Sequence, residues 1–254
     1  MAMILPSRQA SFRGTTRALL ALTTCLMWAA APARADVWAQ SRAAYAALNS
    51  YADHGSVETI YRSGAGPTLT EQHVFTTSYQ APRRFRLDFK SGSAGAGERF
   101  VIWSEGEVFN TWWSTTKVAS VFPRGQGTMA FAIGSSPTKG AATVIPPLIF
   151  AKSGLQGPLS NLTLTVQPAL ESVAGHPCYQ LRGTESQLYG SGRATNVRAV
   201  TLWIDRDSLL VRKVFEDTPE SLGPATVSQV ITTIDPQGNP PIEAASFHFE
   251  PPAP

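Results

Sequence analysis

The stretch Arg84-Phe85-Arg86-Leu87-Asp88-Phe89-Lys90 alternates charged and apolar side chains without a break. Successive side chains of a β-strand point to opposite faces of a sheet, so this period of two predicts a strand with one wet face and one apolar face. Turns rich in Gly and Pro separate it from other strand-like runs along the chain. These runs are residues 56–62, 71–79, 98–104, 107–114, 162–166, 178–184, 198–205, 209–216, 226–234 and 246–249.

Helical patterns are few. Residues 36–51 predict an N-terminal helix, because Asp36 can cap it and apolar side chains recur at helical spacing. Residues 125–150 predict two short helices joined by a loop at 134–140, because Pro146 and Pro147 interrupt any longer one. About ten or eleven short strands in meander order, with no helix between most of them, favour an α+β fold with a large, curled antiparallel sheet. We expect a single domain over residues 36–254.

The first 35 residues have the pattern of a signal peptide. A basic segment reaches Arg17, small and apolar residues follow from Ala18 to Ala31, and Ala33-Arg34-Ala35 fits a cleavage site. We therefore expect export to a bacterial periplasm with a cut after Ala35. The alternative is that 22–25 form a lipidation box and that Cys25 is acylated and retained.

The composition excludes several classes of protein. The chain is 43% hydrophobic and 15% charged, which is too apolar for a disordered protein. The formal charge of +3 depends on four arginines within the first 35 residues; without them 17 basic residues face 18 acidic ones. Bulk charge therefore gives no reason to expect nucleic acid or an anionic membrane as a partner.

The sequence contains no recognisable catalytic or metal-binding motif. An H-E-x-x-H metal motif, a G-x-S-x-G nucleophile motif and a P-loop are all absent, and the four histidines are scattered. Cys178, the one cysteine after the leader, is expected to be a small buried hydrophobe. We expect no enzyme activity, no cofactor and no metal.

Aromatic residues gather in the strand region and allow two interpretations. They either fill an ordinary core or line a pocket for an acyl chain on the concave face of the sheet, covered by the segment from Met129 to Phe150. The pocket hypothesis takes as lining residues Phe85, Leu87, Phe89, Trp103, Trp112, Phe131, Ile149 and Phe150, with Arg83, Arg84 and Arg86 near a head group at the rim.

The ordered set of motifs resembles the superfamily of periplasmic lipoprotein carriers (LolA-like), including its predicted periplasmic members of unknown function. The matching segments span nearly all of residues 36–254 and are 81–86, 100–106, 108–112, 203–211 and 247–252. The resemblance implies an unclosed antiparallel β-barrel with a helical lid, a cavity for acyl chains, and no cofactor or catalytic residue. One departure is Ala81, which stands directly before Pro82 where the carriers have an arginine that helps to hold the lid shut.

Two functional hypotheses follow. The first is a monomeric periplasmic protein that binds a lipid or the acyl chains of a lipoprotein, as a carrier or a sensor. The second is an interaction module that recognises another envelope protein through a sheet edge or an exposed tryptophan face, with no bound ligand.

Overall fold

The computed structural model describes residues 36–253, apart from 63–67, 93–96, 107, 123–131, 134–136, 154, 156, 158, 160–161, 190–193 and 218–226. The expected signal peptide, Cys25 and Phe131 lie outside the described residues. The described part of the chain belongs to one compact unit. No helix within it is long and apolar enough to cross a lipid bilayer.

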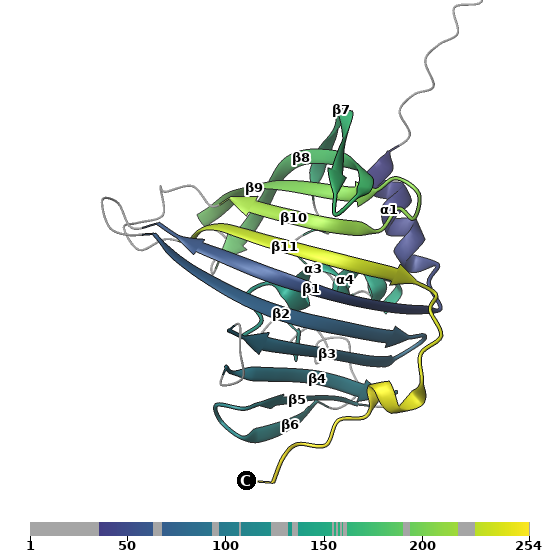
Figure 1. The fold of residues 1–254 in the computed structure, drawn as a ribbon, viewed down its shortest axis with the longest axis vertical. Helices are drawn as coiled ribbons and strands as arrows, with labels where there is room; N and C mark the ends of the chain where they lie inside the picture. The colour runs from purple at the N-terminus through teal and green to yellow at the C-terminus, as the bar shows by residue number, and fades with distance from the viewer. Residues whose placement is uncertain are drawn as a thin grey trace, which may run out of the picture. The chain divides into compact units, whose positions relative to one another are not determined.

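Eleven strands form one open antiparallel sheet (Figure 1), which confirms the predicted fold class. The order across the sheet is β6-β5-β4-β3-β2-β1-β11-β10-β9-β8-β7, two meanders joined where the first strand pairs with the last. The strands are β1 (Ser50–Tyr61), β2 (Leu69–Gln80), β3 (Arg84–Ser91), β4 (Arg99–Glu105), β5 (Phe109–Trp113), β6 (Val118–Phe122), β7 (Thr163–Val173), β8 (His176–Tyr189), β9 (Ala194–Asp205), β10 (Val211–Asp217) and β11 (Val227–Gly238).

Helices cover one face of the sheet, which we call the inner face; the opposite face is the outer face. They are α1 (Val37–Ala46), α3 (Ala141–Val144) and α4 (Pro146–Ile149), and Figure 1 shows all three behind the sheet. Their apolar side chains share one core with the inward-pointing residues of β1–β5 and β8–β11. Short 3-10 helices follow at η1 (Ala151–Ser153) and η4 (Ala244–Phe247).

The alternation of β3 was predicted correctly. Phe85, Leu87 and Phe89 are buried on the inner face, with exposed fractions of 0%, 0% and 3%. The intervening Arg86 and Asp88 point outward, where their side chains form an ion pair of 3.0 Å. The period of two therefore fixed which side chains of this strand enter the core.

Two local predictions were wrong, and one strand was missed. The first helix ends at Ala46 rather than Tyr51, because Asn239 Oδ1 accepts hydrogen bonds from the backbone N–H groups of Asn49 and Ser50 and directs the chain into β1. Strand pairing with β2 and β11 then overrides the helical spacing. Residues 246–249 are not a strand, since η4 ends there, and β6 was not foreseen.

Candidate ligand-binding site

Phe150 lies at the centre of an aromatic cluster on the inner face. It directly follows α4, is 2% exposed, and meets the rings of Tyr79, Phe85 and Phe109 edge-on at centroid distances of 5.2, 5.4 and 5.8 Å. Edge-to-face pairs of this kind contribute beyond their buried area. The three partners come from β2, β3 and β5, so one side chain from the helical segment fills the space that three strands enclose.

The segment that carries Phe150 crosses the inner face from one end of the strands to the other. At its start, the Lys139 ammonium donates to the Tyr61 hydroxyl at 3.0 Å and lies 3.2 Å from Glu71 Oε2. Glu71 and Tyr79 stand at opposite ends of β2, about 27 Å apart along the strand. The segment includes α3 and α4, each only four residues long and neither closed by a side-chain cap. Such short helices depend on tertiary packing for their stability.

The structure brings together five of the eight predicted lining residues. Phe85, Leu87, Phe89, Ile149 and Phe150 all belong to the inner-face core. Phe131 lies outside the described residues. Whether these side chains contact a ligand stays a prediction.

The two predicted tryptophans lie elsewhere, which corrects the predicted arrangement. Trp103 pairs with the outward-pointing Arg86, so Trp103 and Trp112 point away from the inner face and form a separate cluster with Val101 and Phe249. The Phe249 ring lies 5.0 Å from Trp103 and 5.6 Å from Trp112. The tail after η4 thus covers both indoles on the outer face.

The predicted rim arginines do not surround the inner-face cluster. Arg86 donates to the carbonyl of His248 at 2.8 Å and lies over the Phe249 ring on the outer face. Arg84 is exposed and donates to Gln80 Oε1, next to the turn that joins β2 to β3. Arg83 belongs to that turn and is partly buried. Arg86 therefore anchors the C-terminal tail.

The inner face also holds a buried carboxyl group. Asp53, on β1, is 7% exposed, and its Oδ2 accepts a hydrogen bond from the Tyr51 hydroxyl at 2.8 Å. Burial raises the pKa of Asp53 to about 7, because the charged form loses its hydration. Glu216, on β10, lies toward the other end of the strands, and burial likewise raises its pKa above the ordinary value.

A polar pocket of about 600 Å³ opens at the end of the inner face where the helical segment begins. His73, on β2, forms part of its wall; the side chain is 5% exposed and stacks on Phe89 at 5.2 Å. Its Nδ1 and Nε2 are buried and have no hydrogen-bond partner. The lining residues are Thr70, Glu71, Gln72, His73, Phe89, Ser91, Gly92, Glu98, Pro137 and Lys139.

Sequence reasoning missed this pocket. Lys139 and His73 are 66 positions apart, and only the crossing of the helical segment over β2 brings both to one pocket. One signal was available: His73 alternates with Phe75, Thr77 and Tyr79, and this places a histidine on the buried face of β2.

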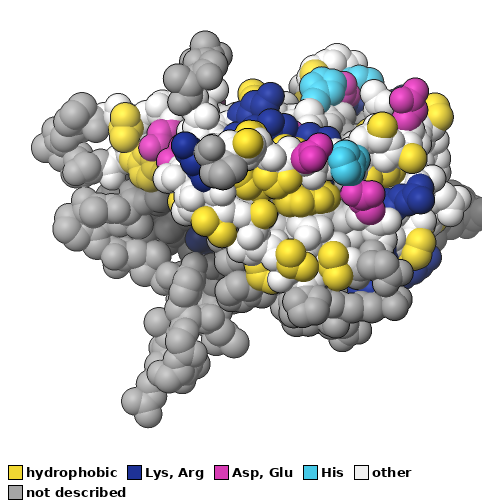
Figure 2. All heavy atoms as spheres, turned by 90° about the horizontal axis from the view of Figure 1, so that it is seen from below, with side chains coloured by type: hydrophobic (Ala, Val, Ile, Leu, Met, Phe, Trp, Pro, Cys, Tyr) yellow, Lys and Arg dark blue, Asp and Glu magenta, His cyan; other side chains and the backbone are white. Residues whose placement is uncertain are grey.

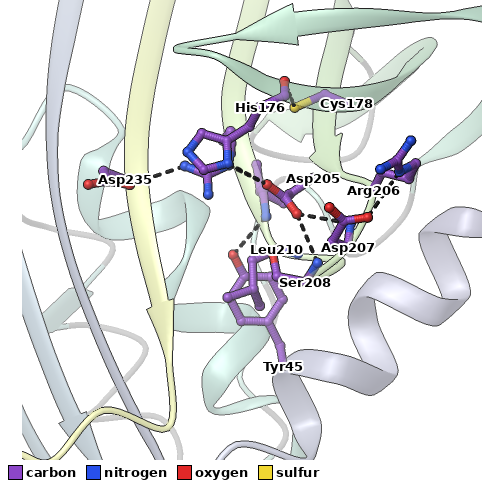
Figure 3. Close-up of polar contacts among 11 residues, drawn as sticks. Tyr45, His176, Cys178, Asp205, Arg206, Asp207, Ser208, Leu210 and Asp235 are labelled. Atoms are coloured by element: carbon purple, nitrogen blue, oxygen red, sulfur yellow. Dashed lines mark hydrogen bonds and ion pairs between the residues drawn. The ribbon is translucent and has the colours of Figure 1, made fainter.

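The outer face carries a charge network that ties three strands together (Figure 3). Asp205 Oδ1 accepts from the backbone N–H groups of Asp207 and Ser208, which confirms the predicted tight turn. Asp205 Oδ2 accepts from Arg212 at 2.6 Å, and Arg212 also donates to Asp235 on β11 at 3.1 Å. Burial opposes ionisation of Asp205, but these donors outweigh it and lower its pKa to about 2.

Cys178 behaves as the sequence predicts. It is fully buried beside this network, and its thiol donates to the carbonyl of His176 at 3.4 Å (Figure 3). Burial raises the pKa of the Cys178 thiol, so the reactive thiolate is disfavoured. Within the described ranges no three His, Cys, Asp or Glu side chains are placed to hold a metal ion.

Comparison with known proteins finds similarity only among solved structures. No family model matches the chain. No curated protein matches it either.

The solved structures that match include LprF from Mycobacterium bovis, with 13% identity, 82% of this chain and 93% of that chain covered, and a TM-score of 0.43. A DUF1329 family protein from Desulfovibrio piger has 13% identity, 84% and 95% coverage, and a TM-score of 0.35. A LolA superfamily protein from Nitrosomonas europaea has 9% identity, 84% and 96% coverage, and a TM-score of 0.33. The architecture itself rests on the strand order and register described above.

Proposed function

We propose that this protein binds the acyl chains of a lipid or lipoprotein between the inner face of the sheet and the helical segment 137–150, as a carrier or a sensor in the periplasm. The observation that carries the proposal is the seating of Phe150. Its ring occupies an aromatic site formed by Tyr79, Phe85 and Phe109 and meets each of these three rings edge-on. An apolar site that accepts a phenyl ring presents the surface that an acyl chain requires.

The energies favour exchange of the ring for a chain of moderate length. Burying a phenylalanine side chain stabilises a protein by about 3 kcal/mol, and three edge-to-face contacts contribute about 3 kcal/mol more. Each buried methylene group contributes about 0.8 kcal/mol. A chain of about eight methylene groups therefore offsets the loss of the Phe150 contacts, and net binding needs a longer chain that also offsets the freedom lost on association.

Native mass spectrometry of residues 36–254, exported and purified without detergent, tests the proposal. We expect an additional mass that organic solvent removes and that proves to be an acyl lipid. Delipidated protein should then take up fatty acids in a chain-length series, with binding appearing beyond about eight methylene groups. A bare polypeptide mass that also fails to take up long-chain fatty acids would contradict the proposal.

The second candidate function is an interaction module, and the β6 edge favours it. Val118 and Val121 on this edge strand are 59% and 65% exposed. Figure 2 views the molecule from the β6 end of Figure 1 and shows hydrophobic side chains gathered there among charged and histidine side chains. An exposed edge strand is a template for an extended segment of another protein. Capture of an envelope protein that ignores added lipid and is lost in Val121→Lys would favour this function.

A further inference from the structure

We propose that the polar pocket at the start of the helical segment binds a zwitterionic head group that carries a phosphate and a primary ammonium. The inference deepens the proposed function, because it assigns the polar part of the ligand to one end of the inner face. The pocket is separate from the aromatic cluster: Glu71 and His73 come from the beginning of β2, whereas Tyr79 comes from its end.

His73 supplies the first reason to expect a ligand. A neutral imidazole has one N–H donor and one acceptor nitrogen, and buried polar atoms in folded proteins nearly always have partners. Here both ring nitrogens are buried and unpaired, and the Glu71 carboxylate, at 3.6 Å from Nε2, is beyond hydrogen-bond distance. Burial lowers the pKa of His73, which keeps the ring neutral. Because neither nitrogen is exposed in the empty pocket, a polar ligand would satisfy this ring after a rotation of the His73 side chain toward the pocket.

The charges on the pocket wall define the class of ligand. Lys139 is held by Tyr61 and Glu71, and its side chain remains 40% exposed, so its ammonium retains a face toward the pocket. Glu98 is an exposed carboxylate from the start of β4, on the β3–β4 side. Glu71, although burial alone would raise its pKa, has a lowered pKa because Lys139 and Tyr61 donate to it.

One ammonium and two carboxylates disfavour a simple anion, which Lys139 attracts but Glu71 and Glu98 repel. A simple cation is attracted by the two carboxylates but leaves the Lys139 ammonium without a partner in the ligand. A ligand with a phosphate near Lys139 and an ammonium near Glu98 uses both walls. Charge-assisted hydrogen bonds of this kind are the stronger class. Thr70, Gln72 and Ser91 also line the pocket and add neutral polar groups.

The position of the pocket is consistent with a lipid. The Phe89 ring stacks under His73 and belongs to the inner-face core, so the pocket borders the apolar region directly. An acyl chain that starts at this pocket would run beneath α3 and α4 toward the Phe150 site. A free small zwitterion offers the same chemistry without the chain, and the experiment separates these two sources.

The test follows the ring nitrogens of His73 by NMR in ¹⁵N-labelled protein during titration with O-phosphoethanolamine, and in parallel with inorganic phosphate and with ethanolamine. We expect O-phosphoethanolamine to shift the His73 resonances at about millimolar concentration, and each half-ligand to act at least about tenfold more weakly. Dodecanoyl lysophosphatidylethanolamine, whose chain exceeds about eight methylene groups, should bind more tightly than O-phosphoethanolamine if the source is a lipid, and no more tightly if it is a free zwitterion.

Three variants and one control identify the pocket. Lys139→Gln and Glu98→Gln should each weaken O-phosphoethanolamine binding about tenfold, and His73→Phe, which keeps the stack on Phe89, should weaken it similarly by calorimetry. Lys117→Gln is the control, because Lys117 is an exposed lysine with a positive φ of 56°, close to the 51° of Lys139, in the β5–β6 turn, and is not part of the pocket lining.

Each outcome decides between the two proposals. Unmoved His73 resonances, or binding that Lys139→Gln and Lys117→Gln alter equally, would overturn the pocket while leaving acyl binding untouched. Uptake of long-chain fatty acids together with no preference for phosphatidylethanolamine over phosphatidylglycerol would do the same. Binding of O-phosphoethanolamine by a protein that takes up no acyl chain would support the pocket and overturn the proposed acyl site.

Discussion

Asp53 shows how one residue gives the protein a dependence on pH. Its pKa is about 7 in the folded protein, against an ordinary value of 3.8, because the carboxyl group is buried beside Tyr51. A folded-state pKa above the unfolded one means that the folded protein holds a proton that the unfolded chain has released. The free energy of unfolding therefore falls as the pH rises from about 4 to about 7.

Replacing Asp53 with asparagine should remove this dependence. The amide keeps an oxygen that can accept from Tyr51 but has no charge to desolvate. We expect the wild-type protein to lose about 2–3 kcal/mol relative to Asp53→Asn between pH 5 and pH 8, because each pKa unit corresponds to about 1.4 kcal/mol. Urea unfolding at the two pH values measures the difference. If the difference in unfolding free energy between wild type and Asp53→Asn were the same at pH 5 and pH 8, Asp53 would ionise normally in the folded protein.

The fold was more predictable from residues than the site was. The alternation of Phe85, Leu87 and Phe89 gave the correct buried face of β3, because that period is a property of the strand alone. The faces of Trp103 and Trp112 depend on how β4 and β5 pair with β3, and that register is set by turns and by the C-terminal tail. The pocket around His73 needed tertiary contacts that no local pattern encodes.

At the scale of elements, the helical segment and the C-terminal tail each place a phenylalanine in an aromatic site. Phe150 fills the inner site, and Phe249 fills the outer site between Trp103 and Trp112. Arg86 and Arg99 lie over the Phe249 ring, and Arg86 also holds the tail backbone. Phe150 packs edge-on against the rings of Tyr79, Phe85 and Phe109, and we expect only this inner site to exchange its ring for a ligand.

Phe150→Ala should separate stability from ligand binding. Removing the ring should cost about 3–5 kcal/mol of unfolding free energy. Acyl ligands should bind about tenfold more tightly or better, because they no longer displace the ring. Phe247→Ala is the matched control, because Phe247 is 1% exposed but lies outside the inner-face core. This variant should have a lower unfolding free energy but the wild-type affinity for acyl ligands. Weaker binding in Phe150→Ala would mean that the ring is a wall of the site.

Phe249→Ala should uncover the outer tryptophans without affecting acyl binding. Trp103 and Trp112 are 8% and 6% exposed beneath the Phe249 ring. We expect a red shift in tryptophan emission and a loss of about 2–4 kcal/mol in stability, since a largely buried ring is removed. Titration with a long-chain fatty acid should give the wild-type affinity. A clear loss of affinity would connect the outer cluster to the ligand site.

For the molecule as a whole, two carboxyl groups act in opposite pH ranges. Asp205 has a folded pKa of about 2, mainly because its backbone and Arg212 donors overcome its burial. A lowered pKa stabilises the fold above the ordinary value of 3.8, and this stability is lost as the pH falls toward 2. The Asp53 contribution instead declines above about pH 4. Together they favour mildly acidic conditions.

The unfolding free energy should therefore be greatest near pH 4 when only these two groups are considered. Arg212→Met should lower the free energy of unfolding that is lost between pH 4 and pH 2 by about 1–2 kcal/mol, a value reduced for partial solvent screening. The decrease in unfolding free energy above pH 5, which comes from Asp53, should stay the same. Thermal unfolding across pH 2–8 for wild type, Asp53→Asn and Arg212→Met measures both effects. A stability maximum at pH 8 in the wild type would contradict the assignment.

The pairing of β1 with β11 also determines when this sheet can be completed. Tyr51 on β1 lies opposite Gly238 on β11, which is 187 residues later in the chain. The first strand to be synthesised can therefore pair on this side only after the last strand has been synthesised. Until then β1 has one free edge and the inner-face aromatics of the first meander lack the other half of their core. A contact of such long sequence separation slows folding and prolongs exposure of apolar surface. The sheet therefore cannot close its core until the last strand of the chain is made, and apolar residues of the first meander stay uncovered until then.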